Sequence, residues 1–521
     1  MADSIRIKQQ NGGANPLTAG KTSNSEENSE ENYNYNNTMK KIILFLLCSV
    51  LLNACKADYP GKMDDPSAEV SVVSFSRLDT TISVAKGYYD LSAYVRGNDS
   101  VLLVVQANGM RSSVLLAKDV WHVVNIRGID AGSGEVAISG EALDGGSAVA
   151  LSDVSVRSVN LTAGSKRVFI KGGDMSMLTQ VEKNKGVYRD AEGKAGDCFA
   201  LCAANGMNLA RLRLYNAPGG EQFPGNQLWN DVQTEDAILA LARRAKEAGM
   251  AIELTFHYSD YWTNGSEQYK PAAWQSYDMA QLKEAVYTYT RDFLNKMNAQ
   301  GTGPEYVSLG NEIQSGILFG NADKPDSIGG YVNDMQALAA LLNEGSRAVR
   351  EACPEARIIL HLTTSSTINL GTYKWFLSNM KNYNCDYDII GASYYPFYGN
   401  YTIETIMDWA KTLTEMYDKD FIVMETGFAW TEKQPDGSDG QIKDNTPYGI
   451  SEEAQWSFLQ GLTEAIKAGS PRVLGYIYWD PIYIDAPNCG WKKDGQNVTA
   501  NSALFDYEGK VLPAVNAMKY N

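Results

Sequence analysis

Eight short apolar segments between residues 166 and 521 constrain the fold more than any other feature of the sequence. They alternate with amphipathic segments such as DAILALARRAKEAG (236–249), which has an apolar stripe, late Lys and Arg residues and a terminal glycine. The apolar segments occupy residues 167–175, 209–216, 250–260, 305–313, 357–364, 387–396, 421–430 and 473–481. Because strands that alternate with helices form parallel sheets, and eight such units close into a barrel, we predict an α/β fold with a (β/α)8 TIM barrel over residues 166–521.

A doubly wound parallel sheet is the competing α/β architecture. It requires a glycine-rich turn after its first strand that cradles a phosphate group. The sequence Lys171-Gly172-Gly173-Asp174 does not supply such a turn, so the barrel is favoured.

A different pattern precedes the barrel. Between residues 64 and 160 about seven short Val- and Ser-rich segments alternate apolar and polar residues, and turn residues separate them. This pattern predicts a small all-β sandwich domain. Trp121 is the only tryptophan in the segment, so two functions stay open for it, a sugar-binding module and a plain spacer.

The first 55 residues are predicted to form an N-terminal extension followed by a targeting signal. Residues 1–38 are rich in Asn, Ser and Glu and lack apolar periodicity, so we expect a disordered or non-native extension. Residues 39–55 combine two lysines, an apolar run too short to span a bilayer, and Leu52-Asn53-Ala54-Cys55, which resembles a bacterial lipoprotein signal. We therefore expect an exported protein, held at the bacterial outer membrane or cell surface by lipid on Cys55. An ordinary signal peptide is the alternative.

Charge and cysteine content exclude several function classes. The formal net charge is -16, whereas a nucleic-acid-binding protein needs a clustered basic surface, so we expect no nucleic-acid partner. Cys198 and Cys202 are four residues apart in an Ala/Leu-rich stretch and read as small buried hydrophobes on one helix face. The three histidines show no zinc-ligand spacing, so zinc hydrolysis is disfavoured.

Candidate reacting groups lie at the strand ends, because a βα barrel presents its chemistry at the carboxyl ends of its strands. The residues there are Asp174, Arg213, His257, Asp260, Asn311, Glu312, Tyr394, Tyr395, Glu425, Trp479 and Asp480. Glu312 ends the fourth strand and Glu425 the seventh. A pair of carboxyl groups across a barrel mouth is what acetal hydrolysis needs, although either glutamate alone could be a structural partner of an arginine.

Cations and aromatic rings accompany this pair. Arg213 and His257 are expected to hold Glu425 ionised, because a nearby positive charge or donor favours a carboxylate; an ordinary salt bridge at the barrel mouth is the alternative. Trp262, Trp274, Trp430, Trp479 and Trp491 fall in or near the same loops, and indole rings suit the CH-rich faces of sugars.

At these residues the sequence resembles the endo-β-1,4-galactanases of glycoside hydrolase family 53, which belong to a clan of retaining barrels. The resemblance rests on KGGDMSML, ARLRLYN, TFHYSDYW with KPAAW, SLGNEIQSGIL, VMETGFAW and YIYWDP with NSALFDYEGKVLPAVNAMK. It implies Glu312 as acid/base, Glu425 as nucleophile, and Arg213, His257, Asn311 and Trp479 around the cleaved sugar. No cofactor is implied for the chemistry.

Two departures from the family pattern affect the outer subsites. The family usually has Trp-Ala-Asp-Pro where this chain has Trp262-Thr263-Asn264-Gly265, and Leu-Trp-Pro where it has Leu318-Phe319-Gly320. The full set of residues expected to contact substrate is Asp174, Arg213, His257, Asp260, Trp262, Trp274, Asn311, Tyr394, Trp430 and Trp479.

The sequence therefore predicts a retaining endo-hydrolase whose partners are β-1,4-galactan, including type I arabinogalactan and pectin side chains, galacto-oligosaccharides, and the membrane through its anchor. Two alternatives remain: another retaining endo-glycanase such as a mannanase or xylanase, and a non-catalytic glycan-binding surface lipoprotein.

A calcium site is a further prediction. Asp436, Asp439 and Asn445 offer the oxygen ligands that calcium prefers, in a segment that resembles a calcium-binding loop of some family members. The histidine usual in that loop is missing, and a solvated turn explains these residues equally well.

Overall fold

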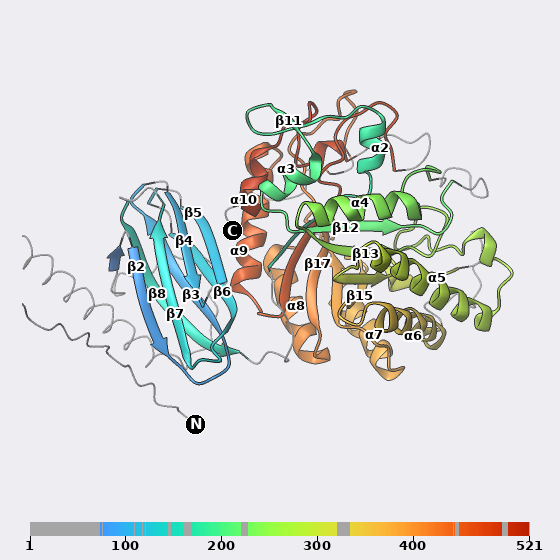
Figure 1. Cartoon of the computed structure of the whole chain (residues 1–521), viewed down its shortest axis with the longest axis horizontal. Coiled ribbons are helices and arrows are strands. Elements are labelled where there is room, and N and C mark those ends of the chain that lie inside the picture. The colour runs from blue at the N-terminus through green and yellow to red at the C-terminus, as the bar shows by residue number, and fades with distance from the viewer. Residues whose placement is uncertain are drawn as a thin grey trace, which may run out of the picture. The chain divides into compact units, whose positions relative to one another are not determined.

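The computed structural model describes residues 73–75, 77–99, 101–108, 110–116, 118–119, 121–143, 147–159, 169–219, 228–319, 334–399, 401–440, 442, 448–491, 497 and 499–519. These residues form two compact units, an N-terminal all-β unit and a larger unit whose described part begins at Phe169 (Figure 1). The targeting segment with Cys55, and Asn445, lie outside the described residues, so the predictions made for them stay predictions.

The N-terminal unit consists of two antiparallel four-stranded sheets, with strand orders β1-β8-β3-β6 and β2-β7-β4-β5. Its strands are β1 (Val73–Phe75), β2 (Arg77–Ser83), β3 (Tyr88–Gly97), β4 (Val101–Ala107), β5 (Met110–Leu116), β6 (Trp121–Asp130), β7 (Glu135–Ala142) and β8 (Val149–Val159). Alternate residues of β7, such as Val136 and Ile138, are buried in a core of their own, whereas Glu135 and Ala137 are exposed. The predicted all-β fold is confirmed.

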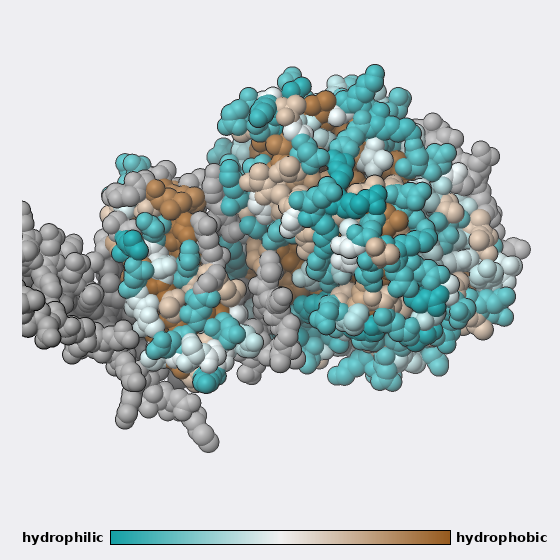
Figure 2. All heavy atoms as spheres, in the orientation of Figure 1, coloured by the Kyte–Doolittle hydropathy of each residue, from teal (hydrophilic) through white to brown (hydrophobic). Residues whose placement is uncertain are grey.

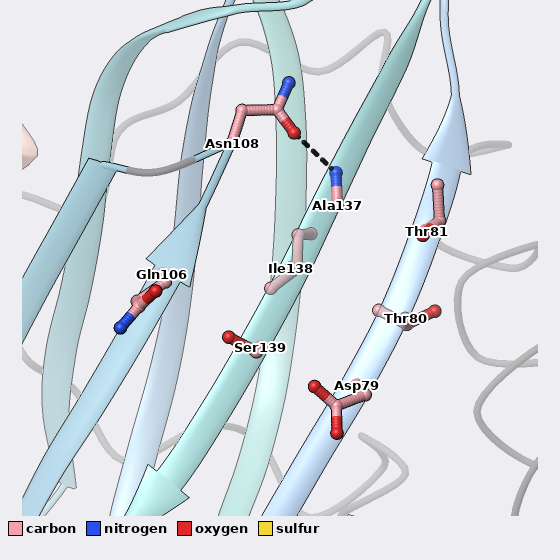
Figure 3. Close-up of a pocket in the computed structure, with 8 residues that line it drawn as sticks. All are labelled: Asp79, Thr80, Thr81, Gln106, Asn108, Ala137, Ile138 and Ser139. Carbon is pink, nitrogen blue, oxygen red and sulfur yellow. Dashed lines mark hydrogen bonds between the residues drawn. The ribbon is translucent and has the colours of Figure 1, made fainter.

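A hollow of about 470 Å³ opens on the β2-β7-β4-β5 sheet of this unit (Figure 3). It is lined by Asp79, Thr80, Thr81, Gln106, Asn108, Ala137, Ile138 and Ser139. Asn108 accepts a hydrogen bond of 2.8 Å from the backbone N–H of Ala137. The hollow is polar and its lining contains no aromatic ring, so it lacks the surface on which sugars usually stack.

The larger unit is a closed barrel of eight parallel strands in the order β12-β13-β14-β15-β16-β17-β18-β9. The strands are β9 (Ile170–Asp174), β12 (Leu209–Leu214), β13 (Ala251–Phe256), β14 (Tyr306–Leu309), β15 (Arg357–Leu362), β16 (Ile389–Ser393), β17 (Asp420–Thr426) and β18 (Val473–Tyr478). Seven of the eight fall within the segments predicted from the sequence, and β17 begins one residue before its segment, so the predicted (β/α)8 barrel is confirmed.

Helices surround these strands (Figure 1). They are α2 (Leu178–Lys183), α3 (Cys198–Ala204), α4 (Glu235–Glu247), α5 (Met279–Ala299), α6 (Met335–Ala352), α7 (Leu370–Asn382), α8 (Ile403–Tyr417), α9 (Glu452–Ala468) and α10 (Asn516–Lys519). The predicted helix α4 begins after Thr234, whose side chain accepts from the N–H of Ala237, and ends before Gly249, whose φ of 76° suits glycine. No helix in the described part of the chain is both long and apolar enough to cross a membrane.

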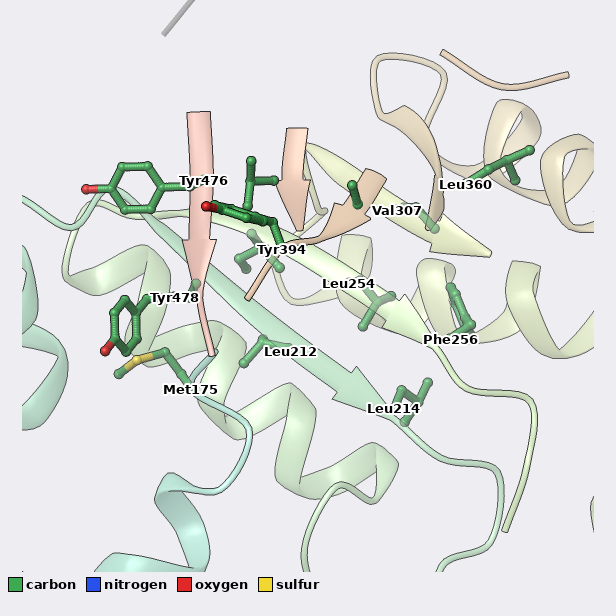
Figure 4. Packing of buried hydrophobic residues seen from close by; sticks show 14 of the residues in the cluster. Met175, Leu212, Leu214, Leu254, Phe256, Val307, Leu360, Tyr394, Tyr476 and Tyr478 are labelled. Atoms are coloured by element: carbon green, nitrogen blue, oxygen red, sulfur yellow. The ribbon is translucent and has the colours of Figure 1, made fainter. Parts of the chain in front are cut away.

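The main hydrophobic core lies between the strands and the helices. Residues such as Leu212, Leu254 and Tyr394 belong to it (Figure 4). Each large apolar side chain buried there contributes about 1.5–3 kcal/mol to folding. On the outside, hydrophilic residues cover most of the visible face of this unit (Figure 2).

A second apolar cluster fills the bottom of the barrel interior. It consists of Ile170, Leu209, Ile359, Ile389, Ile422, Met424, Leu474 and Ile477. A Cβ atom at Gly391 would lie 2.5 Å from Met424, so the closeness of the packing requires glycine there. The charged side chains of the next layer of the barrel interior therefore lie directly above a closely packed layer of apolar side chains.

Candidate active site

Strand parity decides which side chains reach the barrel interior. In β12, Leu209 belongs to the interior cluster while Ala210, Leu212 and Leu214 belong to the core beneath the helices. Because successive side chains point to opposite faces of a strand, Arg211 and Arg213 follow Leu209 into the interior. Both guanidinium groups are fully buried.

Glu425, near the end of β17, is held by two groups. Its Oε1 accepts a hydrogen bond of 2.6 Å from Nη1 of Arg211, and its Oε2 accepts one of 3.2 Å from the hydroxyl of Tyr395. Burial raises the pKa of Glu425 to about 7, Arg211 opposes this rise, and the charge of Glu312 adds to it.

Arg211 is the central cation of the site. Besides Glu425 it donates to Oδ1 of Asn311 at 2.7 Å and lies 3.7 Å from Asp174 and 3.6 Å from Glu253. One guanidinium thus orients the Glu425 carboxylate and the amide that precedes Glu312 in the chain. The contacts of Arg211 with Glu425 and Asn311 make it a functional residue that the sequence prediction missed.

The structure corrects the prediction that Arg213 holds Glu425 ionised. Its guanidinium pairs with Asp174 and with Asp480, each at 3.1 Å, and not with Glu425. The physical reason is depth: β12 pairs in register with β9 and β13, so Arg211 lies one inward layer below Arg213 and reaches the carboxylate first. Arg213 instead lies 4.3 Å above the ring of Trp479, where a cation–π contact orients the indole.

His257 was also predicted to hold Glu425 ionised, and the structure gives it other contacts. Its Nδ1 hydrogen-bonds to Thr263 Oγ1, and its ring stacks on Tyr215 with centroids 4.2 Å apart. Burial, with both arginines nearby, lowers the pKa of His257 well below its usual range. A neutral ring supplies no positive charge to Glu425.

Glu312 follows β14 and has left-handed backbone angles, φ 52° and ψ 53°. This conformation is costly for a residue with a side chain and persists only where its surroundings enforce it, often at functional sites. Its carboxylate accepts hydrogen bonds from the Ser393 hydroxyl at 2.7 Å and from the Gly265 N–H at 3.3 Å.

Three indoles form an aromatic wall beside these groups. Trp262 stacks on Trp491 with centroids 5.0 Å apart, and Trp479 meets both rings edge-on. Asp480 accepts from Nε1 of Trp491 as well as from Arg213, which links the wall to the charged network. The predicted residues Trp262 and Trp479 are thus brought together, and Trp491 joins them.

Four other predicted contact residues lie elsewhere. Trp274 and Tyr394 belong to the main core, where Trp274 packs against Tyr289 and the Tyr394 hydroxyl bonds to the carbonyl of Tyr401. Both tyrosines follow β16, and because successive side chains point to opposite faces, Tyr394 packs into the core while Tyr395 reaches Glu425.

The two remaining residues, Asp260 and Trp430, make contacts that hold loops together. Asp260 accepts from the backbone N–H groups of Ala217 and Ala272, each at 2.8 Å, and so ties two loops together. Trp430 packs on Tyr507 and donates to the carbonyl of Ala500. Both residues have structural partners that explain them without a substrate.

The acidic segment proposed for calcium offers a poor donor set in its described part. Asp439 is ion-paired with Lys433, and Asp436 accepts from the backbone and the hydroxyl of Ser438. Among the residues that the structure describes, no group of three or more His, Cys, Asp or Glu residues could hold a metal ion.

Four buried carboxyl groups share the two buried guanidinium groups: Asp174, Glu253, Glu425 and Asp480. Burial raises the pKa of Glu253 to about 7 against the opposing effect of Arg211. Because the folded-state pKa exceeds the unfolded value of about 4.3, the folded protein binds the proton more tightly. The stability that this provides is present below about pH 4 and is lost as the pH rises through about 7.

We therefore expect Glu253→Gln to raise the melting temperature relative to the unmodified protein increasingly between about pH 4 and pH 7, since the amide needs no proton. Thermal unfolding at several pH values measures this difference. Glu247→Gln, at an exposed position of α4, serves as the control and should show no such trend. A difference that is constant over this range would contradict the assignment.

A closed parallel barrel with one glutamate after β14, another on β17 held by an arginine, and an aromatic wall is typical of a glycoside hydrolase. The sequence profile of glycosyl hydrolase family 53 matches residues 170–518. The chain belongs to this family.

Related proteins agree with this assignment. The arabinogalactan endo-β-1,4-galactanase of Cellvibrio japonicus is 31% identical over 358 residues, which cover 66% of this chain and 89% of that protein. The endo-β-1,4-galactanase of Bacillus subtilis is 28% identical, with coverage of 71% and 89%. Among solved structures, the family 53 catalytic domain of Ignisphaera aggregans has a TM-score of 0.62 and 30% identity, covering 70% of this chain and 98% of that one.

Proposed function

We propose that this protein is a retaining endo-hydrolase of β-1,4-galactan and type I arabinogalactan. The observation that carries the proposal is the pair Glu312 and Glu425, presented from β14 and β17 of a family 53 barrel. The names of the related galactanases support the choice of galactan over mannan or xylan. The complete set of reacting groups favours turnover over mere glycan binding.

In the first step Glu425 attacks the anomeric carbon while Glu312 gives its proton to the departing glycosidic oxygen. Arg211 and Tyr395 orient the Glu425 carboxylate for this attack. The C–O bond to the leaving sugar breaks and a galactosyl–Glu425 ester forms. In the second step Glu312 takes a proton from water, which attacks the same carbon and releases the sugar with its β configuration retained.

The test is the product ladder that residues 56–521 release from purified galactan, with mannan and xylan digested in parallel. Oligosaccharides of several lengths from galactan alone would support the proposal. Products from mannan alone or from xylan alone would show that this polysaccharide, and not galactan, is the substrate. Binding of galactan without any product would point to the non-catalytic alternative.

We also propose that Cys55 carries the lipid anchor, on the strength of the signal that it ends. Since stable anchoring requires more than one acyl chain on the new N-terminus, Cys55→Ala should move the protein from the membrane fraction to the soluble fraction. Fractionation of cells that express each form, followed by immunodetection, measures the change. Equal membrane partition of both forms would count against the anchor.

If the segment from Asp436 to Asn445 binds calcium, chelation should lower the melting temperature, because the ion stabilises only the folded form. Scanning calorimetry with EDTA and then with added calcium measures the effect. An Asp439→Asn variant should remove the response, and an unchanged melting temperature in EDTA would eliminate the site.

A further inference from the structure

Behind Glu312 lies a chain of two hydrogen bonds that runs through Ser393 to His361. The Ser393 hydroxyl, at the end of β16, donates to Oε1 of Glu312 at 2.7 Å. Nε2 of His361, on β15, lies 2.8 Å from the same hydroxyl oxygen. Ser393 is 1% exposed and His361 is fully buried, so water does not compete for the bond between them.

The direction of the chain follows from a count of hydrogens. The Ser393 hydroxyl has one hydrogen, and it donates that hydrogen to Oε1 of Glu312. Its oxygen must therefore accept from His361, which places the imidazole hydrogen on Nε2. Within the described residues the buried Nδ1 atom of His361 has no hydrogen-bond partner, as suits a nitrogen without a hydrogen. Burial also lowers the pKa of His361 well below its usual range, so the ring is neutral.

We propose that His361 and Ser393 are positioning residues that keep Oε1 of Glu312 as a hydrogen-bond acceptor and so place the catalytic proton on Oε2. This inference rests on the proposed function, in which Glu312 is the acid/base. In the first step the proton leaves Oε2 for the glycosidic oxygen, and the negative charge that remains is shared with Oε1. In the second step Oε2 takes a proton from the attacking water. His361 and Ser393 neither gain nor lose a proton in either step.

The arrangement stabilises the transition state more than the ground state. While Glu312 is protonated, the Ser393 bond to Oε1 joins two neutral groups. As the proton leaves, the bond becomes charge-assisted, and such bonds are about twice as strong. Interactions that strengthen only on the way to the transition state raise the rate of the chemical step.

The loop that contains Gly265, on the other side of Glu312, also favours a proton on Oε2 rather than on Oε1. The Gly265 N–H approaches Oε2 at the longer distance of 3.3 Å. A Cβ atom at position 265 would lie 1.9 Å from the amide nitrogen of Gln314, so glycine lets this loop come close. Oε2 therefore faces a weak donor and stays available to carry the proton, while Oε1 accepts the shorter hydrogen bond from Ser393.

The experiment compares Ser393→Ala with the unmodified protein on two substrates: galactan, and an aryl β-galacto-oligosaccharide whose activated phenol leaves without a proton. The quantity measured is kcat/KM, which reports the first step. Loss of one charge-assisted hydrogen bond should lower kcat/KM on galactan roughly 10- to 100-fold, through kcat. On the aryl substrate we expect a change of less than about 3-fold.

Three further variants separate positioning from folding, and a fourth serves as the control. Ser393→Thr keeps the hydroxyl and should restore much of the galactan rate. His361→Gln keeps a donor and should lose less than His361→Leu. Ser346→Ala, in α6, removes an equally buried hydroxyl that donates to the carbonyl of Asp386, and it should leave kcat/KM on both substrates unchanged.

The pH profile provides the readout that a structural role would not change. Without the Ser393 donor the charged form of Glu312 loses support, so the basic limb of kcat/KM should move to higher pH. Equal losses on both substrates with an unmoved basic limb, or full activity of Ser393→Ala on galactan, would overturn the assignment. If the unmodified protein cuts neither substrate, the proposed function itself is wrong.

Discussion

Glu425→Gln should abolish turnover on galactan and on activated aryl substrates alike, by roughly 10⁴- to 10⁶-fold. The carboxylate that forms the glycosyl ester is then missing, and no leaving group can compensate for it. Because the amide is isosteric and neutral, and the carboxyl that it replaces lies among three other buried acids, the variant should fold normally. Initial rates on both substrates, with circular dichroism as the folding control, measure the effect.

Glu312→Gln should behave differently. Its kcat/KM on galactan should fall by about 10²- to 10⁴-fold, the usual contribution of general acid catalysis, while an activated phenol should still leave. Azide should then accelerate turnover by intercepting the glycosyl–Glu425 ester, and the product should be the β-azide.

Two outcomes would contradict the retaining assignment. An α-azide product would indicate direct displacement at the anomeric carbon. A ligand complex in which the two carboxyl groups lie about 6.5–9.5 Å apart, rather than about 5–5.5 Å, would leave room for the water of an inverting mechanism.

Arg211→Met should be the most destabilising single substitution in the barrel interior. It leaves Glu425, Glu253 and Asp174 with fewer opposite charges in a site that excludes water. Removal of one partner of a buried ion pair costs about 3–5 kcal/mol. Urea unfolding at neutral pH measures this loss, and adding Glu253→Gln to the same chain should recover part of it, because one uncompensated charge disappears.

The matched control is Arg244→Met. Arg244 also pairs with two carboxylates, Glu182 and Asp197, but its side chain is 28% exposed. The loss there should stay within about 1 kcal/mol. Similar losses for both substitutions would mean that the interior network contributes no more than a surface ion pair.

A conservative Arg211→Lys variant isolates the electrostatic effect on catalysis. Lysine keeps the charge but cannot reach both Glu425 and Asn311 with a planar fork. Glu425 must be ionised to attack the anomeric carbon. A weaker interaction with the cation at position 211 therefore raises the pKa of Glu425 and moves the acidic limb of the kcat/KM profile to higher pH. An acidic limb at the same pH as in the unmodified protein would show that Arg211 does not control the charge of Glu425.

The order of strands and helices could be predicted from the sequence because it depends on local periodicity. Apolar runs bounded by turns predicted all eight barrel strands, and two of the predicted segments contained Glu312 and Glu425 near their carboxyl ends. The same reasoning considered only the last residues of each strand and therefore missed Arg211, two residues deeper in β12. The alternation of LARLRL already contained this information, since residues two apart in a strand point the same way.

Other partners had no sequence signal. Ser393, His361 and Glu312 lie on three different βα units, and their hydrogen bonds depend on the closure of the barrel. Glu425 lies opposite Ser393 because the register between β16 and β17 shifts between Ala392 and Ser393, which no pattern in either strand announces.

The sequence by itself thus determined the fold, the family and the two glutamates, because period-two and helical periodicities, and residue types at strand ends, are local properties of the chain. Only the tertiary structure decided which arginine holds Glu425, which tyrosine joins it, and that His361 supports Glu312 through Ser393. These assignments depend on depth and register inside a closed barrel, where a shift of one residue sends a side chain to the opposite face and a shift of two moves it to another layer.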